Sequence, residues 1–383
     1  MSTTGDGDPW GITTLDLFEL LEDAVHSDQS WAVATVIAVD GSAYRRPGAK
    51  MLFGPDDSAF GGITAGCLEG PLADVASEVR RADEPEIATF DLTSDDDGWG
   101  LGLGCEGIVD ILVEPVTRSW QAPVEAYHRG EPIALATVTD DTAPVPVGTR
   151  AGIAVDGTSI ETGEPSLPSS VLEAVSERAG ELAAAGRSET VTVTTRDGSV
   201  DVFVDGIDPI DRLLIFGGQP DTRPVSRLAR EVGLHVTVAT ARGGQADLDR
   251  FPNADRVVAT HPTDLEELVD DRTSVVLMSH NLLDDRLALE ALLETEVPFI
   301  GLMGPRDRFQ RIREGLEDDG VTLSAADRDR IATPVGLDLG GGETVEIALS
   351  IVGEVVAASN GRDGGRLRDR EGPIHDRVQS QPE

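Results

Sequence analysis

The fold is decided by one stretch, Arg212-Leu213-Leu214-Ile215-Phe216-Gly217-Gly218-Gln219-Pro220-Asp221-Thr222-Arg223, in which an apolar run leads into a glycine-rich turn and a helical pattern. This order is typical of the first strand and first helix of a doubly wound parallel sheet. Further apolar runs predict strands at 235–239, 256–259, 274–278 and 299–303, with helices of about ten residues between them. We therefore expect residues 209–361 to form a Rossmann-like domain whose last helix spans 345–359.

The glycine-rich turn departs from the G-x-G-x-x-G pattern with which such folds bind dinucleotides. Gln219 stands where a glycine would let a pyrophosphate approach, and Thr240 stands where an acidic residue would bind the ribose hydroxyls. NAD(P) is therefore a doubtful ligand. Gly217 and Gly218 remain candidate cofactor-binding residues, and Arg242 offers a planar guanidinium to a phosphate or another anionic group. A surface salt bridge is the alternative role for Arg242.

A histidine follows the predicted strand at 274–278, at the sheet edge where doubly wound folds bind ligands. We expect this residue, His280, to converge there with Asp285 of the next helix and with Arg306. His280 would contact a cofactor or handle a proton, and a loop histidine that caps the helix is the alternative. The six histidines of the chain show no metal-ligand spacing, so we expect no zinc site.

The residues before this domain repeat one layout. Its parts are apolar runs at 33–37 and 133–138, glycine-led runs at 48–53 and 148–153, helical patterns at 71–81 and 169–182, and closing strands at 109–114 and 200–205. A helix precedes the first copy, with Thr14 as its expected cap. Residues 14–208 should therefore form one α+β domain built of two related halves. Residues 1–13 are expected to be a disordered acidic tail and residues 362–383 a polar C-terminal tail.

Glycines surround one of the two cysteines in the first of these halves. The run Gly61-Gly62-Ile63-Thr64-Ala65-Gly66-Cys67-Leu68-Glu69-Gly70 precedes the helical pattern, and Pro71 suits a first helical turn. Cys67 should therefore lie at or just before a helix N-terminus, where the helix dipole and free N–H groups favour a thiolate. A buried cysteine that packs as a small hydrophobe is the alternative.

Two more blocks flank this run. The upstream block reads Gly41-Ser42-Ala43-Tyr44-Arg45-Arg46-Pro47-Gly48-Ala49-Lys50-Met51-Leu52. The downstream block, Gly100-Leu101-Gly102-Leu103-Gly104-Cys105-Glu106-Gly107, presents the second cysteine in the same manner. Only the first half carries cysteines and the pair Arg45-Arg46, so we place the chemistry of the domain there.

Together the three blocks resemble the XdhC/CoxI family, whose members are maturation factors for molybdenum hydroxylases such as xanthine and carbon monoxide dehydrogenases. Later segments match the family in the same order, at residues 214–218, 250–255, 278–281, 299–304 and 333–340. The resemblance implies an accessory factor that binds the molybdenum cofactor (molybdopterin), supports its sulfuration and inserts it into the hydroxylase. The cofactor-binding residues that it implies in the first domain are Arg45, Arg46, Lys50, Cys67, Glu69 and Cys105, with Cys67 as the metal ligand.

The expected partner is a molybdenum hydroxylase apoenzyme, and a cysteine desulfurase and a homodimer are left open as further partners. No set of nucleophile, base and oxyanion donors is apparent, so we expect binding and transfer of the cofactor, with no catalytic residues. Two other classes stay open. A nicotinamide-dependent oxidoreductase would use the Rossmann-like domain as a true cofactor site, and a structural assembly factor would hold no cofactor and leave both cysteines buried.

The composition is strongly acidic, with 70 acidic against 31 basic residues, a single lysine and a formal net charge of −39. Such a surface repels nucleic acid and anionic membranes, so neither is an expected partner. A high-salt, halophilic cytoplasm explains the charge, because salt screens the repulsion, and a basic partner is the alternative. The N-terminus lacks the apolar core of a signal peptide and no apolar run could span a membrane, so we expect a cytoplasmic protein.

Overall fold

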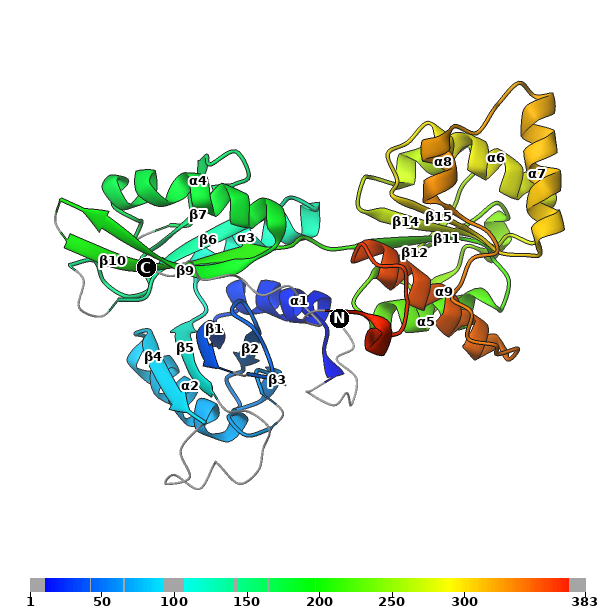
Figure 1. Cartoon of the computed structure of the whole chain (residues 1–383). Coiled ribbons are helices and arrows are strands. Elements are labelled where there is room, and N and C mark those ends of the chain that lie inside the picture. The colour runs from blue at the N-terminus through cyan, green and yellow to red at the C-terminus, as the bar shows by residue number, and fades with distance from the viewer. Residues whose placement is uncertain are drawn as a thin grey trace. The chain divides into compact units, whose positions relative to one another are not determined.

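The computed structural model describes residues 11–41, 43–64, 66–92, 107–140, 144–163, 165–196 and 198–371. The chain divides into two compact units, Met1–Ile210 and Asp211–Glu383, which run from blue to green and from green to red in Figure 1. Within the described ranges, no helix is both long and apolar enough to cross a membrane. Cys105 lies outside the described residues, as do 1–10 and 372–383 of the two predicted tails.

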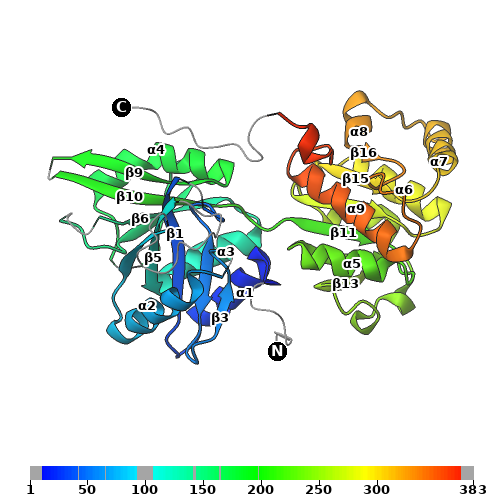
Figure 2. The ribbon, with the colours of Figure 1, turned by 60° about the horizontal axis from the view of Figure 1, so that its bottom comes forward.

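Each half of the first unit contains a five-stranded antiparallel sheet, and both sheets have the same strand order. In Figure 2 the first half is coloured blue to cyan and the second is mostly green. The first half contains α1 (Thr14–Val25), β1 (Ala32–Gly41), β2 (Lys50–Phe53), β3 (Ala59–Gly61), α2 (Glu69–Ala82), β4 (Glu86–Asp91) and β5 (Gly107–Pro115), in the sheet order β3-β2-β1-β5-β4. The second contains α3 (Gln121–Arg129), β6 (Ile133–Val138), β7 (Arg150–Ala154), β8 (Ser159–Ile160), α4 (Ser169–Ala185), β9 (Ser188–Thr195) and β10 (Gly198–Ile207), in the sheet order β8-β7-β6-β10-β9. The prediction of two related halves is confirmed.

The cap of α1 differs from the one expected. Thr13, not Thr14, is the N-cap, and its Oγ1 accepts a hydrogen bond from the Asp16 N–H at 3.2 Å. The Asp16 carboxylate in turn accepts from the Thr13 N–H at 2.8 Å, which completes a capping box. Such a box needs an acceptor three residues after the cap. Thr13 has Asp16 at that position, whereas Thr14 has the apolar Leu17.

One hydrophobic cluster joins the two halves of the first unit. It includes Leu21 of α1 and Leu52 of β2 from the first half, and Leu135 of β6 from the second. The rings of Phe18 in α1 and Tyr127 in α3 stack with their centroids 4.0 Å apart. Because this core is shared, neither half can bury its apolar face alone, and the two halves fold as one body.

The second unit is a six-stranded parallel sheet in the order β13-β12-β11-β14-β15-β16. Its elements are β11 (Arg212–Phe216), α5 (Thr222–Glu231), β12 (His235–Thr240), β13 (Arg256–Ala259), β14 (Thr273–Leu277), α6 (Leu282–Leu293), β15 (Phe299–Leu302), α7 (Arg306–Asp318), α8 (Ala325–Arg330), β16 (Ile331–Ala332) and α9 (Thr344–Ser359). The strand order reverses between β11 and β14, which is the topological switch point of a doubly wound sheet. The predicted Rossmann-like sheet is confirmed.

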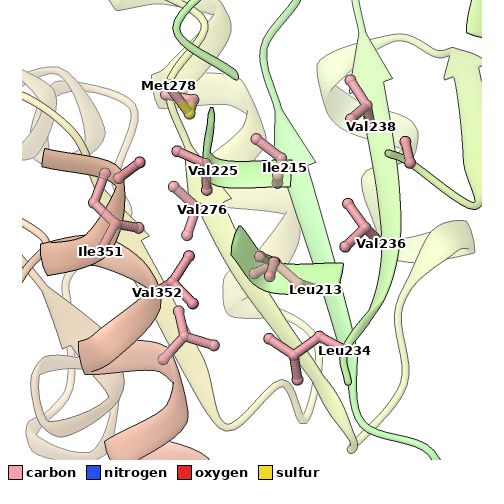
Figure 3. Packing of buried hydrophobic residues seen from close by; sticks show 14 of the residues in the cluster. Leu213, Ile215, Val225, Leu234, Val236, Val238, Val276, Met278, Ile351 and Val352 are labelled. Carbon is pink, nitrogen blue, oxygen red and sulfur yellow. The ribbon is translucent and has the colours of Figure 1, made fainter. Parts of the chain in front are cut away.

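Helices cover both faces of this sheet (Figure 1). Helices α5 and α9 pack on one face, where Val225 and Val352 meet Leu213 and Val276 of the strands, as Figure 3 shows. Helices α6 and α7 pack on the other face, against alternate side chains of the same strands. Alternation along buried parallel strands thus supplies one apolar surface to each helix layer.

Two features of the second unit differ from the expectation. The short strand β16 was not predicted, because two residues are too few to show a strand pattern. The strands β12, β13 and β14 are joined by 3₁₀ turns and not by helices of about ten residues. The glycines Gly243 and Gly244 and the proline Pro252 disfavour a longer helix between β12 and β13.

Candidate functional site

The first unit has a cavity of about 160 Å³ between the start of α1 and the loop that joins β1 to β2. We call it the α1 cavity. Arg45 and Lys50 line it, together with Tyr44 of the same loop and the glycines Gly61 and Gly62 that precede the cysteine turn. The structure therefore brings two of the predicted basic residues to one cavity. These lining residues come from two of the sequence blocks singled out above, 41–52 and 61–70. Arg46 is exposed on the same loop.

Lys50 is not exposed on the cavity wall but nearly buried, and it is paired. Its Nζ lies 2.5 Å from Oδ2 of Asp205 in β10 and donates to the Gly48 carbonyl at 2.9 Å. Asp205 comes from the second half of the unit, so this ion pair joins the two halves. The charge of Lys50 is already compensated by the buried Asp205 carboxylate. Lys50 therefore shapes the cavity wall and does not extend its ammonium group into the cavity.

The second half repeats this arrangement. Arg150 of β7 pairs with the Glu114 carboxylate of β5, and its Nε donates to the Gly148 carbonyl at 3.2 Å. Burial lowers the pKa of Arg150 to about 10, while the charge of Asp205 opposes this shift, so the guanidinium stays positive at neutral pH. The two cations lie 6.0 Å and 5.5 Å from the ring centroid of the buried Trp120.

The turn that carries Cys67 is held by one carboxylate. Glu69, the first residue of α2, accepts hydrogen bonds from the Thr64 N–H at 3.1 Å, the Thr64 hydroxyl at 2.9 Å and the Leu68 N–H at 3.1 Å. The Thr64 hydroxyl in turn accepts from the Cys67 N–H at 3.2 Å. Glu69 therefore positions the turn with its own carboxylate. This role was not evident from the sequence, from which we expected Glu69 to bind the cofactor.

Cys67 lies two residues before the start of α2, as expected, and its side chain is partly buried. The side chain packs against the hydrophobic cluster of β1, β2 and α2 and keeps part of its surface open to solvent. Cys105, the second predicted thiol, lies outside the described residues. Within the described residues, no group of three or more His, Cys, Asp and Glu side chains could hold a metal ion.

The second unit has a polar cavity of about 220 Å³ where β11, β12 and β14 end. We call it the edge cavity. Four of the predicted site residues line it, namely Gly217, Gly218, Arg242 and His280. Gln219 and Thr240, the two departures from the dinucleotide pattern, line it as well. A Cβ on Gly217 would lie 2.6 Å from the Met278 carbonyl oxygen, so this glycine is required by the close approach of two strand ends.

Asp285 and Arg306 are not among the residues that line the edge cavity. Asp285 is buried, where it accepts from the Ser279 N–H at 3.2 Å and pairs with Arg308 at 2.6 Å. Arg306 is exposed at the first position of α7. Arg308, two residues after Arg306 in α7, is the partner of Asp285, and no pattern in the sequence distinguishes it from its neighbour Arg306.

His280 has a different partner from the one expected. Its backbone is in the left-handed region, with a φ of 61°, and its Nε2 donates to Oδ2 of Asp221 at 2.7 Å. A positive φ costs free energy in a residue other than glycine, so the surrounding structure holds His280 in this conformation. Asp221 stands in the stretch that decides the fold, yet its partner is 59 residues away, and no local pattern in the sequence indicates the pair.

Two family comparisons match the chain. Residues 24–91 match the XdhC and CoxI family, and residues 213–355 match the XdhC Rossmann domain. The first match contains the Cys67 turn and the part of the α1 cavity wall from Tyr44 to Gly62, and the second contains the edge cavity.

Similar proteins match over most of the length of the chain. A Bacillus subtilis (strain 168) protein, named as a subunit of a probable xanthine dehydrogenase, is 26% identical over 351 residues, which are 88% of this chain and 96% of the relative. The crystal structure of a xanthine dehydrogenase from Bacillus halodurans is 29% identical, with a TM-score of 0.71 over 90% of this chain and 96% of that one. An uncharacterized Escherichia coli (strain K12) protein, YqeB, is 27% identical over 172 residues, 44% of this chain and 31% of YqeB.

Proposed function

The chain belongs to the XdhC and CoxI family, and from this premise we propose that it is a maturation factor for a xanthine dehydrogenase type hydroxylase. In this proposal it binds the molybdenum cofactor as cargo, keeps it while its terminal sulfur is installed, and inserts it into the apoenzyme. The observation that carries the proposal is the match to the Bacillus subtilis relative, which spans 96% of that protein and whose name refers to a xanthine dehydrogenase.

The residues of the first unit suit such a cargo. Molybdopterin carries a phosphate and a dithiolene-bound molybdenum, so a binding site needs cations and a soft ligand. Arg45 lines the α1 cavity, Arg46 is exposed beside it, and the glycines at the end of β3 lead from that cavity to Cys67. In the proposal the two arginines hold anionic groups, Lys50 and Glu69 fix the wall and the turn, and Cys67 approaches the metal.

The cargo is tested on protein purified from its native cytoplasm in molar salt. We expect molybdenum by elemental analysis and molybdopterin by oxidation to its fluorescent form, and Cys67→Ser should lower both at least tenfold without changing the unfolding transition. Ser77→Ala, on the exposed side of α2, is the matched control and should retain the wild-type content. Wild-type protein without molybdopterin would reject the proposal, and full retention in Cys67→Ser would reject the role of that thiol.

Insertion is tested with apoenzyme. Loaded chain added to a molybdenum hydroxylase made without cofactor should restore activity, and loading in the presence of a cysteine desulfurase should raise it further. The name of the Bacillus subtilis relative favours one other candidate, a permanent component of the hydroxylase. A permanent component would stay with the mature enzyme in equal amounts through gel filtration, whereas a maturation factor would separate from it.

A nicotinamide-dependent oxidoreductase is the third candidate, because the strand order and the edge cavity match those of dinucleotide-binding folds. Against it, Gln219 occupies the turn that would approach a pyrophosphate, and Thr240 offers no carboxylate to a ribose. We expect NAD and NADP to bind weakly or not at all in a calorimetric titration at high salt. Micromolar affinity for either would favour the oxidoreductase.

A further inference from the structure

The second sheet of the first unit ends in a long strand with a neighbour on one side only. Strand β9 pairs with β10 and with no other strand of the described chain, and Figure 2 shows it as the outermost strand beside β10. Within the described ranges, no backbone hydrogen bond joins residues 188–194 to a segment other than β10. The first half touches β9 through a side chain, since Thr190 Oγ1 donates to the Ile37 carbonyl at 3.1 Å. The outer backbone groups of β9 can therefore pair with a further strand.

The other edge strands of the described sheets are shorter. Strands β3, β8, β13 and β16 have between two and four residues, and β4 has six, with an acid at each end. Strand β9 has eight residues, without proline or lysine, and its register with β10 is unbroken. Proteins protect edge strands by making them short or by adding charges, proline or bulges. Strand β9 lacks these protections apart from one charge, Glu189.

That one charge is compensated within the second half. The Glu189 carboxylate accepts two hydrogen bonds from the Arg178 guanidinium of α4, at 2.6 Å and 2.8 Å. Such a bidentate pair fixes both side chains. In a chain with a net charge of −39, a strand whose only acid is paired is a place where a second copy can approach with little repulsion.

The sequence of β9 is symmetric about Thr192. Residues 190–194 read Thr-Val-Thr-Val-Thr, with the three threonines exposed and Val191 and Val193 in the hydrophobic cluster beneath α4. An antiparallel copy of the strand centred on Thr192 would place threonine opposite threonine and valine opposite valine. Pairs of β-branched residues and of threonines directly opposite each other stabilise adjacent strands.

We propose that β9 pairs with β9 of a second copy of this chain, antiparallel and centred on Thr192, to form a homodimer about a two-fold axis. The two five-stranded sheets would then form one sheet of ten strands. A second copy fits better than an unrelated strand, because the order of residues 190–194 matches its own reverse. One strand pair is small beside the interfaces of about 1,200–2,000 Å² that are typical of stable complexes, so we expect a reversible dimer with a micromolar Kd.

The first half supplies a matched control. The Thr192 hydroxyl donates to Oδ1 of Asp201 on β10 at 2.6 Å, and the Thr89 hydroxyl donates to Oδ1 of Asp110 on β5 at 2.6 Å. Both threonines are exposed on the edge strand of their sheet, but β4 lacks the symmetric order of β9. A change at Thr89 therefore reproduces the local cost of the same change at Thr192 without touching the proposed interface.

Sedimentation velocity of the full chain in 1 M KCl, at protein concentrations from about 1 µM to 1 mM, tests the pairing. We expect a monomer–dimer equilibrium whose Kd rises at least tenfold in Thr192→Glu and in Thr192→Lys, since like charges would lie directly opposite each other. A role confined to the monomer would give the two changes opposite effects, because lysine attracts Asp201 and glutamate repels it. Thr89→Glu and Thr89→Lys should dimerise as the wild type does. A monomeric wild type, or a dimer that neither change at Thr192 weakens, overturns the proposal.

Cysteine substitutions test the register. In a background in which both native cysteines are serine, Thr192→Cys should form a disulfide between two copies on mild oxidation, because this position faces its own counterpart. Thr190→Cys and Thr194→Cys should each stay unlinked alone and should link to each other when the two proteins are mixed. Thr89→Cys is the control and should stay unlinked. If Thr192→Cys links no faster than Thr89→Cys, the strands do not pair in this register and the proposal is wrong.

The outcome is separable from that of the proposed function. A chain that retains molybdopterin and sediments as a monomer at every concentration would contradict the strand pairing and leave the maturation role standing. A dimer that depends on Thr192, in a chain that carries no molybdopterin from its native cytoplasm, would support the pairing and contradict the role.

Discussion

Glu69 makes the Cys67 turn depend on one carboxylate. Its oxygens accept from two backbone N–H groups and one hydroxyl within the turn, so the charge is held by the chain itself. Hydrogen bonds to a charged group contribute about 1.5–3 kcal/mol each, more than neutral ones. The conformation in which Cys67 is presented therefore follows from Glu69 and Thr64, and the glycines permit that conformation without fixing it.

Glu69→Gln should loosen this turn. An amide NH₂ cannot accept, so at least one of the three bonds is lost, and we expect a loss of about 1–2 kcal/mol in the free energy of unfolding. In a Cys105→Ser background, Cys67 should also react faster with a thiol reagent. Glu78→Gln, exposed on α2, is the control. If the reaction rate of Cys67 is unchanged, Glu69 does not hold the turn.

His235, at the start of β12, makes the second unit sensitive to pH. Burial lowers its pKa below the ordinary value of 6.5, the charge of Asp255 opposes this, and Arg212 and Arg230 lower it further. Well above pH 6.5 the histidine is neutral in both the folded and the unfolded chain. As the pH falls below 6.5, the unfolded chain binds the proton first, so the folded state loses stability until the lowered pKa is reached.

The prediction is that the unfolding midpoint falls between pH 7 and pH 5 more steeply in the wild type than in His235→Gln. Denaturant unfolding at a series of pH values measures this slope in both proteins. The many carboxylates of the chain titrate in both proteins, so the difference between the two slopes isolates the contribution of His235. Equal slopes would contradict the prediction, because they would show that the pKa of His235 is the same in the folded and the unfolded chain.

Two buried ion pairs between strands join the two halves of the first unit. Lys50 in β2 meets Asp205 in β10, and Arg150 in β7 meets Glu114 in β5, with the Trp120 ring close to both cations. Both pairs are nearly fully buried. A buried ion pair stabilises the fold little more than a pair of hydrophobic residues of similar size would. Removing one partner, however, leaves the other charge buried without compensation, which costs about 3–5 kcal/mol.

A double-mutant cycle on Lys50 and Asp205 tests this. Lys50→Met should destabilise the first unit by about 3–5 kcal/mol because Asp205 is left buried without its cation. Lys50→Met with Asp205→Leu should recover most of that loss in denaturant unfolding. Arg129→Met, which breaks two exposed ion pairs, with Glu125 and Glu131, should cost about 1 kcal/mol or less. If the double variant is no more stable than the single one, the two residues are not coupled.

The strands and helices were largely predictable because they depend on local patterns. The range of β11 and of β13 agrees with the predicted one, and the repeat is visible in the sequence because both halves keep the same glycine before the second strand, Gly48 and Gly148. What failed was either too short for a pattern, like β16, or decided by local competition, like the cap at Thr13 in place of Thr14.

The partners of charged side chains were not predictable. Lys50 and Asp205 are 155 positions apart, and His280 and Asp221 are 59 apart, so nothing local in the sequence marks either pair. The sequence placed Arg45, Gly217, Gly218, Arg242 and His280 in regions where the structure has cavities. It could not show that Glu69 and Asp285 use their carboxylates within the fold, because burial is a property of the folded chain.

Charge sets the conditions under which the whole chain is stable. If each of the 31 basic residues paired with one acidic residue, at least 39 of the 70 acidic residues would still have no cation partner. Some acidic residues are held by the fold: Asp270 accepts from the Thr273 hydroxyl and pairs with Arg212 at 2.9 Å. The excess therefore lies in carboxylates without such contacts, whose repulsion only salt can screen.

Lowering potassium chloride from 1 M to 0.1 M lengthens the Debye length from roughly 3 Å to about 10 Å, so repulsions between neighbouring carboxylates extend across the surface. We expect the melting temperature to fall by about 5–10 °C, which corresponds to a loss of about 2–3 kcal/mol for units of this size. Replacing the exposed acids Asp74, Glu84 and Asp271 with lysine should reduce that dependence, because each replacement removes repulsion and adds an attraction. A melting temperature that stays constant or rises as salt is lowered would contradict adaptation to high salt, and a basic partner would then account for the charge.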